Sequence, residues 1–236
     1  MNGLIQKKLK KKIDEIEYFK PLPGLSSYEI DKKQIQLEET DLGPIYGYQW
    51  RSFNKTYKTQ SEDNGDFHNY TDQLQSIVTK LKTSPYDRRM VCSAWNPNQM
   101  DMMALPPCHW GWNVVVYGDK LNLIWHQRSC DLLLGVGANI ASYALLLELL
   151  AKEAGLVPGE LVGTLADCHI YENHMDAARE LIKREENELP TIEIKAYPGE
   201  NHAYPNPHFS IFDWAWNQAV LTNYNPHDKI DVGGVS

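Results

Sequence analysis

Cysteine is scarce in this chain, and its spacing excludes several classes of protein. The 236 residues include only four cysteines, Cys92, Cys108, Cys130 and Cys168. They form neither a CxxC pair nor a dense framework, which argues against a disulfide-stapled secreted scaffold and fits free thiols in a reducing cytosol. The Cys and His residues also lack the spacing of a zinc site, so we expect no metal.

Long apolar runs and an excess of positive charge are also missing. No run approaches the ~18 apolar residues of a membrane span, and the Lys-rich N-terminus lacks the apolar region of a signal peptide. We therefore expect a cytoplasmic protein that needs no membrane. The formal net charge of −8 disfavours nucleic acid as a partner. The lysine cluster at 7–12 could attract nucleic acid or anionic lipid, but a solvated helix face is the favoured interpretation.

The remaining sequence predicts one α+β domain over residues 1–236. Hydrophobic residues make up 42% of the chain, enough for one large core or two small ones. Periodicity predicts helices at 4–16, 74–81, 139–154 and 173–184, and strands at 28–39, 90–95, 110–117, 121–127, 160–171, 191–197 and 209–214. Residues 53–69 are polar and predict a surface loop. Residues 1–40 form a divergent N-terminal segment, and we expect 223–236 to be a flexible tail.

The clearest geometric prediction concerns Cys108 and Arg128. Two apolar strands follow Cys108, and Gly118-Asp119 between them predicts a hairpin turn. The outgoing and returning strands are nearly equal in length, so Cys108 and Arg128 should meet at one edge of the sheet. A free thiol is most often a small buried hydrophobe, but cationic neighbours favour a reactive thiolate.

Further polar positions allow both a structural and a functional interpretation. Arg88 and Arg89, among only six arginines, suit phosphate binding and surface ion pairing about equally. Asn139 is a good helix N-cap residue, and this competes with a role in binding substrate. The aromatic, Gly-rich stretch 41–51 predicts either a shaped loop over a pocket or an ordinary packed turn.

Three polar side chains share one face of an otherwise apolar strand. Alternation places Asp167, His169 and Tyr171 on the same side. Polar groups are rarely buried without partners, so we expect these three to line a pocket.

Ordered motifs over more than half of the chain resemble the thymidylate synthase family. They read DLGPIYG from Asp41, DRR from Asp87, SAWNP from Ser93, MALPPCH from Met103, QRSCD from Gln127, LG from Leu134, NIASYALL from Asn139, DCHIYENH from Asp167 and YNPH from Tyr224. Many motifs in order at family-like spacing make the resemblance specific. It implies the family's fold, a mixed sheet packed with helices.

The resemblance implies transfer of a one-carbon unit from 5,10-methylenetetrahydrofolate to C5 of dUMP, giving dTMP. Cys108 would add to C6 of the pyrimidine and make C5 nucleophilic. Tyr46 would lie near the proton that leaves C5, and His109 would support the loop beside the nucleophile. Asn139 would read the uracil edge. Family members that act on cytosine carry Asp there, so Asn139 favours dUMP over dCMP. The implied catalytic residues are Cys108, Tyr46, His109, Asn139 and Asp131.

The resemblance also implies how the substrate and the folate are bound. Phosphate would meet Arg128 and Ser129, and the deoxyribose hydroxyl would meet His169 and Tyr171. The implied substrate-binding residues are Arg88, Arg89, Gln127, Arg128, Ser129, Asn139, His169 and Tyr171. The implied folate-binding residues are Leu105, Asp131 and Gly135. In the family the adjacent arginines reach the phosphate of the other subunit, so a homodimer with Arg88 and Arg89 acting across the interface is implied.

Departures from the family pattern keep two alternatives open. The Arg-Thr-Gly phosphate loop and the proton-relay Glu are not found before Asp41. The turn 136–138 is smaller than usual, and the tail 231–236 lacks the apolar ending that closes over the ligands. One alternative is a dUMP or dCMP hydroxymethylase, in which water takes the place of hydride. The other is a nucleotide-binding or scaffold subunit with reduced or no turnover.

Overall fold

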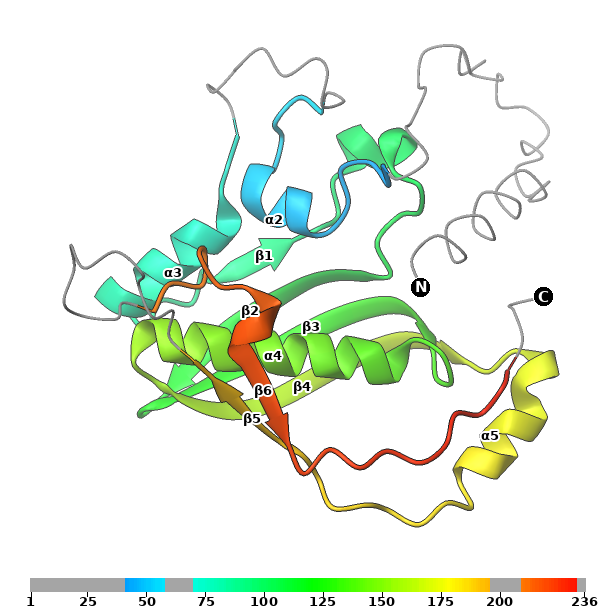
Figure 1. Ribbon diagram of the computed structural model, residues 1–236. Coiled ribbons are helices and arrows are strands. Elements are labelled where there is room, and N and C mark those ends of the chain that lie inside the picture. Colours follow the sequence, from blue (N-terminus) through cyan, green and yellow to red (C-terminus); the bar gives the residue numbers. More distant parts are fainter. Residues whose placement is uncertain (1–40, 58–69, 196–208, 233–236) are drawn as a thin grey trace, which may run out of the picture.

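The computed structural model contains both helices and strands, with helices packed on a mixed sheet (Figure 1), which confirms the predicted α+β class. The structure describes residues 41–57, 70–195 and 209–232. The elements are α2 (Gly47–Ser52), α3 (Gln73–Thr83), β1 (Val91–Ser93), η1 (Pro97–Met102), β2 (His109–Tyr117), β3 (Lys120–Asp131), α4 (Val136–Ala154), β4 (Val157–His169), η2 (Glu172–His174), α5 (Met175–Leu181), β5 (Thr191–Ile194), η3 (Trp216–Gln218) and β6 (Ala219–Thr222). The helix expected at 4–16, the strand at 28–39 and most of the loop at 53–69 lie outside the described residues.

A mixed four-stranded sheet in the order β1-β2-β3-β4 organises the described chain. β2 pairs antiparallel with β1 and β3, whereas β3 pairs parallel with β4. The predicted hairpin is confirmed: Tyr117 pairs with Lys120 across the turn, and Gly118 takes a φ of 64° that suits glycine. A parallel pair needs a crossover connection, and α4 supplies it by crossing one face of the sheet (Figure 1).

The core lies between this face of the sheet and helices α3 and α4. Alternate residues of β2 and β3 face inward, and the buried side chains include Trp112, Leu121, Leu123 and Leu150. Removing apolar surface from water at about 25 cal/mol per Å² is the main force holding these layers together. Helix α3 confirms the prediction at 74–81, and the Asp72 side chain caps it by accepting a hydrogen bond from the backbone of Gln75 (2.9 Å).

The opposite face of the sheet carries exposed apolar side chains. Trp110 is 40% exposed, and Val115 and Val162 are each 43% exposed. Trp110 stacks on His126 (ring centroids 5.2 Å apart), and the His126 ring also hydrogen-bonds to Asn113 (3.1 Å). Large apolar side chains exposed on one face of a sheet can mark an interaction site.

Several predicted elements differ from the observed ones. The segment 209–214, expected as a strand, forms a turn, and the pairing strand is β6, whose partner is β5. The stretch 41–51 contains most of helix α2. Its Gly and Pro residues favour a turn, so the sequence did not predict a helix there. Helix α4 begins at Val136, three residues before the predicted start at Asn139. Gly135 is the residue at its N-terminal boundary. The strand predicted to reach Tyr171 ends at His169.

The segment after β6 has no regular structure and is hydrogen-bonded to the residues that follow α5. The Asn225 carbonyl accepts from Asn187 (2.8 Å), the Asp228 carbonyl accepts from Arg184 (2.6 Å), and the His227 ring donates to the Glu185 carbonyl (2.7 Å). These bonds hold residues 225–228 against the body of the protein. The flexibility expected for 223–236 stays a prediction.

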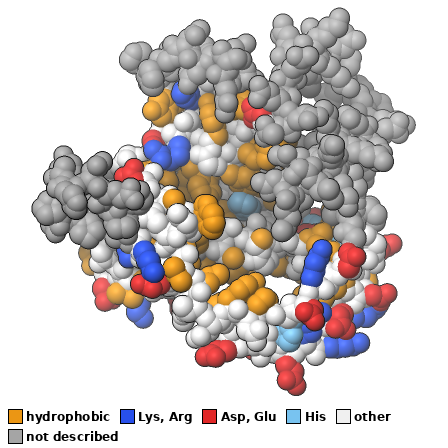
Figure 2. Space-filling model, viewed as in Figure 1, with side chains coloured by type: hydrophobic (Ala, Val, Ile, Leu, Met, Phe, Trp, Pro, Cys, Tyr) orange, Lys and Arg blue, Asp and Glu red, His pale blue; other side chains and the backbone are white. Residues whose placement is uncertain are grey.

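In Figure 2 hydrophobic side chains gather over the middle of the face shown, whereas charged side chains lie mainly along its lower border. Among the described helices, none is long and apolar enough to cross a membrane.

Candidate functional site

The structure brings Cys108 and Arg128 together at one end of the sheet. The Arg128 backbone N–H donates to the Cys108 carbonyl (2.8 Å), which extends the β2–β3 ladder past His109 and Gln127. The Cys108 side chain is half-buried, so its sulfur is neither sealed in the core nor fully solvated. The predicted meeting of the strand ends is therefore confirmed.

The guanidinium of Arg128 is fixed by the loop that leads to the cysteine. Its Nε donates to the Pro107 carbonyl (3.0 Å) and its Nη2 to the Pro106 carbonyl (2.9 Å). Its carbon lies 5.8 Å from the centre of the Trp95 ring, within cation–π range. The two prolines cannot donate backbone hydrogen bonds, and their carbonyls are free to hold the arginine. The remaining N–H groups of Arg128 stay available for an anion.

Tyr46, His109 and Tyr143 form a stacked and hydrogen-bonded group beside Cys108. The Tyr46 hydroxyl accepts from the Cys108 backbone N–H (3.1 Å). Its ring stacks on the His109 ring, with centroids 4.1 Å apart and 17° between planes. The Tyr143 hydroxyl, from α4, is 2.8 Å from His109 Nδ1. The sequence motif identified Tyr46 and His109, but nothing in the pattern singled out Tyr143.

Burial sets the charge states within this group. It lowers the pKa of His109 to about 4, so the imidazole is neutral near pH 7. Burial is also the main reason that the pKa of Tyr46 lies above its ordinary value, with a smaller opposing effect from the Cys108 backbone. Tyr143 has a raised pKa for the same main reason. All three side chains are therefore uncharged at neutral pH.

A glycine and a buried amide cluster position the loop that carries Tyr46. Gly43 has a φ of 78°, and a Cβ there would come within 2.0 Å of the Met102 carbonyl oxygen. Below the loop, Gln49 donates to the Pro44 carbonyl and to Gln99, each at 2.7 Å, and accepts from Asn96 (3.1 Å). No local sequence pattern predicts this cluster, because its three amides come together only in the folded protein. The only hint in the sequence is that each amide lies in or beside a segment that contains turn-forming residues.

Asn139 faces the strand ends instead of capping its helix. It lies in the first turn of α4, and its Oδ1 accepts from Gln127 Nε2 (3.1 Å). Gln127 is itself buried, and it donates to the Ser129 carbonyl (2.9 Å) and accepts from the Trp125 ring N–H (3.2 Å). The N-cap interpretation of Asn139 was therefore wrong. Its Nδ2 donors and the second lone pair of its Oδ1 remain for a ligand.

Asp131 and Gly135 shape the turn between β3 and α4. The Asp131 carboxylate accepts from the backbones of Leu133 and Leu134, each at 3.0 Å, and its carbonyl accepts from Gly135 (3.1 Å). A Cβ on Gly135 would lie 3.8 Å from the Asn139 side chain, so the turn and the amide are close neighbours. Leu105 lies elsewhere, on the loop before Cys108, with its side chain 55% exposed.

The end of β4 supplies the next group of polar side chains. Asp167 pairs in register with Ser129 and His169 with Asp131, so both lie beside the end of β3. His169 Nδ1 is 3.4 Å from the Asp167 carboxylate, and the His169 ring meets the Tyr171 ring edge-on at 5.3 Å. Asp167 is mostly exposed, whereas His169 and Tyr171 are half-buried. Tyr171 lies beyond the end of β4, so strand alternation explains the shared face of Asp167 and His169 but not the position of Tyr171.

Arg88 and Arg89 lie away from this group. They precede β1, whose first residue, Val91, pairs with Asn113 in the middle of β2, whereas Cys108 lies beyond the Ser93 end of β1. Arg89 forms a bidentate ion pair with Asp87 (2.9 and 3.1 Å), whose pKa this arginine lowers to about 2. Surface ion pairing, one of the two interpretations considered, therefore applies to Arg89. Within one protomer neither arginine meets Cys108.

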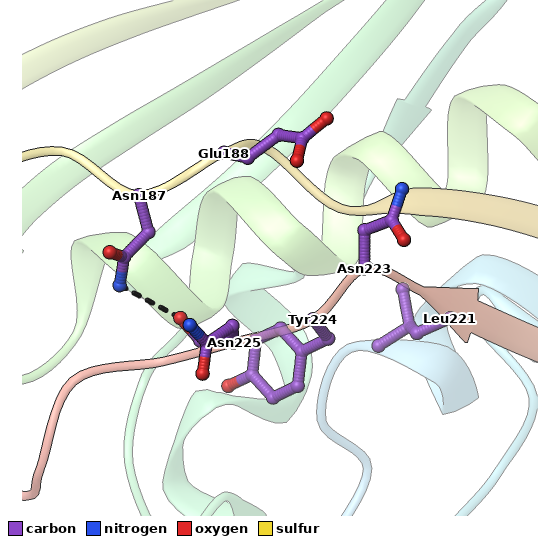
Figure 3. Close-up of a pocket in the computed structure, with 6 residues that line it drawn as sticks. All are labelled: Asn187, Glu188, Leu221, Asn223, Tyr224 and Asn225. Carbon is purple, nitrogen blue, oxygen red and sulfur yellow. Dashed lines mark hydrogen bonds between the residues drawn. The ribbon is translucent and has the colours of Figure 1, made fainter.

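A cavity of about 610 Å³ lies elsewhere, between the end of β6 and the segment before β5 (Figure 3). It is lined by Asn187, Glu188, Leu221, Asn223, Tyr224 and Asn225. None of the site residues predicted from the sequence lines it. Over the part of the chain that the structure describes, no three His, Cys, Asp or Glu residues are grouped so as to hold a metal ion.

Comparison of the chain with known proteins gives matches to one family. The family model described as thymidylate synthase matches residues 14–234. The thymidylate synthase of Saccharomyces cerevisiae is 42% identical over 205 residues, covering 81% of this chain and 62% of that protein. The bifunctional dihydrofolate reductase-thymidylate synthase of Leishmania major is 44% identical over 197 residues, covering 83% of this chain and 36% of that protein. The thymidylate synthase of Herpesvirus ateles is 42% identical over 214 residues, covering 89% and 68%. The chain thus spans about three fifths of the yeast relative and about a third of the Leishmania relative.

Proposed function

Because the chain belongs to the thymidylate synthase family, we propose that it converts dUMP to dTMP with 5,10-methylenetetrahydrofolate as cosubstrate. The observation that carries the proposal is the placement of a half-buried Cys108 beside Arg128, with the strand ends joined by a 2.8 Å hydrogen bond. A thiol beside a fixed cation is the setting in which a cysteine acts as a nucleophile.

Cys108 starts the reaction by adding to the pyrimidine ring of dUMP. Its sulfur forms a bond to C6, and the electron pair of the 5,6 double bond moves toward C5 and O4. The resulting oxyanion needs hydrogen-bond donors already in place. Asn139 suits this task, because Gln127 holds its Oδ1 and leaves its Nδ2 free to donate to O4. Its Oδ1 can accept the N3–H of uracil with the remaining lone pair.

Arg128 and Ser129 hold the phosphate of dUMP in this proposal. The carbonyls of Pro106 and Pro107 fix the arginine plane, so its remaining N–H groups are oriented before the nucleotide arrives. His169 and Tyr171, at the end of β4, bind the deoxyribose hydroxyl. The ends of β3 and β4 thus contact the phosphate and the sugar of one nucleotide.

Tyr46 and His109 act on the proton that leaves C5. Burial keeps Tyr46 a neutral phenol, so it contributes a hydroxyl that orients the proton acceptor instead of a phenolate. His109 is also neutral, with Nδ1 held by Tyr143, which leaves Nε2 as the second hydrogen-bonding atom. These groups direct the proton without adding a charge beside the thiolate.

The residues assigned to the folate suit a flat, partly polar ring system. Leu105 is 55% exposed, so it offers apolar surface to a ligand. Asp131 Oδ1 serves the backbone of the turn, and its other oxygen remains as an acceptor. When bound, methylenetetrahydrofolate supplies the one-carbon unit and the hydride.

A homodimer completes the phosphate site in this account. Within a protomer Arg88 and Arg89 lie at the opposite end of β1 from Cys108. They are therefore too far away to bind the phosphate at the site of their own chain. The exposed face with Trp110, Val115 and Val162 offers the apolar surface that a second copy buries. The cytoplasmic location expected from the dispersed cysteines remains a prediction.

Product analysis tests the proposed reaction. Purified protein is incubated with dUMP and methylenetetrahydrofolate, and the products are identified by mass spectrometry, with Cys108→Ser as the control. We expect a gain of one methyl group together with dihydrofolate, absent in the variant. A hydroxymethyl product with tetrahydrofolate would establish the hydroxymethylase instead, and no product from a folded protein would establish the binding subunit.

A further inference from the structure

A phenol hydroxyl on α4 contacts the histidine beside the proposed nucleophile, and the direction of this hydrogen bond decides what the histidine can do. The Tyr143 hydroxyl lies 2.8 Å from His109 Nδ1. A neutral imidazole carries one N–H proton, and its other nitrogen can only accept. If Tyr143 donates to Nδ1, the proton of His109 is on Nε2. If Nδ1 donates to Tyr143, Nε2 is left without a proton.

Tyr143 is sealed in the core, so its hydroxyl has little choice of partner. The residue is 2% exposed. Its ring stacks on the Trp125 ring, with centroids 5.6 Å apart and 12° between planes, and lies 6.4 Å from the Trp50 ring. Among the residues that the structure describes, only His109 hydrogen-bonds to this hydroxyl. The aromatic contacts therefore aim the hydroxyl at the imidazole.

Only one direction of this bond leaves every buried polar hydrogen with an acceptor. When Tyr143 donates, its hydrogen and the Nδ1 lone pair of His109 are both satisfied. When Nδ1 donates, the buried O–H of Tyr143 has no acceptor, and a buried donor without a partner is rarer and more costly than a spare lone pair. Burial also raises the pKa of Tyr143 above its ordinary value, so the phenol keeps the proton that it donates.

The His109 ring is also held on its other sides. It stacks on the Tyr46 ring with centroids 4.1 Å apart, and it meets the Tyr143 ring edge-on at 5.3 Å. Turning the ring over would break the stack and move Nδ1 away from Tyr143. His109 is nevertheless only half-buried. Nε2 is therefore the ring nitrogen that remains for a ligand.

The same helix positions the amide that is proposed to read the base. Tyr143 follows Asn139 by four residues in α4, so the two side chains share one face of the helix. Asn139 accepts from Gln127 near the end of β3, and Tyr143 reaches His109 at the start of β2. One helix face thus orients the polar groups of both strand ends.

We propose that Tyr143 is a positioning residue for the reaction, because its hydroxyl donates to His109 Nδ1 and fixes the proton of His109 on Nε2. From Nε2, His109 donates a hydrogen bond toward the nucleotide and cannot accept the proton that leaves C5. The part that concerns the nucleotide rests on the proposed function, whereas the tautomer does not.

Nuclear magnetic resonance of the imidazole nitrogens tests the tautomer. The nitrogen-15 shift depends on whether a ring nitrogen carries a proton, and His109→Ala identifies the signals of His109 among the eight histidines of the chain. At pH 7 we expect a proton on Nε2 and none on Nδ1. In Tyr143→Phe, which keeps the ring contacts and removes the hydroxyl, we expect shifts that report a mixture of the two tautomers.

Two results would overturn the assignment. One is a proton on Nδ1 in the wild-type protein, which is decided even if the variant fails to fold. The other is the same single tautomer in a folded Tyr143→Phe, which would mean that the hydroxyl does not set the proton. Neither result depends on whether the protein makes dTMP.

A kinetic arm tests whether Tyr143 acts through His109. Release of tritium from dUMP labelled at C5, in the presence of methylenetetrahydrofolate, follows the proton that leaves C5. In Tyr143→Phe we expect kcat to fall about tenfold with the KM for dUMP within about twofold of the wild-type value. Tyr117→Phe, at an 82% exposed position on the hairpin, makes the same chemical change and should leave kcat unaltered.

The decisive comparison repeats Tyr143→Phe in the His109→Ala background. Residues that act as a unit are not additive, so we expect the second substitution to lower kcat by less than about twofold there. An equal loss in both backgrounds, or a loss that falls on KM alone, would overturn the positioning role. If the wild-type protein releases no tritium, the proposed function fails while the nitrogen shifts still decide the tautomer.

Discussion

At the residue scale, the site depends on side chains whose protonation and orientation are fixed before any ligand arrives. His109 is stacked on Tyr46 and hydrogen-bonded to Tyr143, so its ring can neither rotate freely nor exchange protons readily with solvent. Asn139 is oriented by Gln127 in the same way. Preorganised groups of this kind stabilise charge that develops during a reaction without a cost of reorganisation at that moment.

The pKa of His109 makes a prediction about stability. It is about 4 in the folded protein and about 6.5 in an unfolded chain, so the unfolded state binds the extra proton. The contribution of His109 is therefore fully present above about pH 6.5 and is lost as the pH falls through 4. Urea unfolding between pH 4 and 7 should show the free energy of unfolding falling more steeply in the wild type than in His109→Gln. Parallel curves for the two proteins would contradict the assignment.

Asn139 makes a prediction about substrate choice. In Asn139→Asp the carboxylate still accepts from Gln127, but it loses the Nδ2 donor that suits O4 of uracil and can accept from the amino group of cytosine. One such hydrogen bond is worth about 1.5–3 kcal/mol, so kcat/KM for dCMP relative to dUMP should rise about tenfold or more. Competition between the two nucleotides measures the ratio. A ratio equal to that of the wild type would contradict the assignment of Asn139 as the residue that distinguishes uracil from cytosine.

At the element scale, the sheet places the site and the loop 41–46 completes it. The hairpin between β2 and β3 could be predicted because both strands are apolar, similar in length and separated by Gly118-Asp119. The amide cluster around Gln49 could not, because its members meet only in the folded protein. The N-cap alternative for Asn139 could not be excluded from the sequence, because a good capping residue beside an apolar repeat also fits the first turn of a longer helix.

Two glycines in one short segment offer a matched test of the loop. Gly43→Ala puts a Cβ within 2.0 Å of the Met102 carbonyl at a φ of 78°, and a positive φ alone costs a non-glycine residue about 1–2 kcal/mol. We expect its free energy of unfolding to fall by about 2 kcal/mol or more. Gly47→Ala meets nothing within 4 Å in α2 and should be neutral or stabilising. Equal changes in the free energy of unfolding of the two variants would mean that the loop 41–46 rearranges to accept the added Cβ, which would contradict its rigid placement.

At the scale of the whole molecule, the proposed phosphate site needs two copies of the chain. The apolar face of the sheet is exposed at Trp110, Val115 and Val162, and the Arg88–Arg89 pair lies at the wrong end of β1 to serve its own Cys108. The proposed symmetric dimer through this face would account for both observations, because each copy would offer the same surface and donate the same arginines. The family resemblance implies a homodimer with Arg88 and Arg89 acting across the interface, whereas composition and periodicity alone do not.

Subunit mixing tests whether the arginines act across the interface. A protein with Arg88→Ala and Arg89→Ala lacks the arginines, and Cys108→Ser lacks the nucleophile, so each alone should be inactive. Refolding the two together creates heterodimers in which one site has both an intact Cys108 and intact partner arginines. About a quarter of the wild-type sites should return on statistical mixing, as measured by dTMP formation. Mixtures that stay inactive while native mass spectrometry shows heterodimers would contradict the trans arrangement.

The central claim is that the Cys108 sulfur bonds to C6 of the nucleotide, and covalent trapping tests it most directly. The protein is incubated with 5-fluoro-dUMP and methylenetetrahydrofolate, and the intact and trypsin-digested protein is examined by mass spectrometry. The account predicts an adduct of both ligands on peptide 90–120, located at Cys108 by fragmentation and absent from Cys108→Ser. An adduct on any other residue, or a folded protein that binds both ligands without forming one, would contradict it.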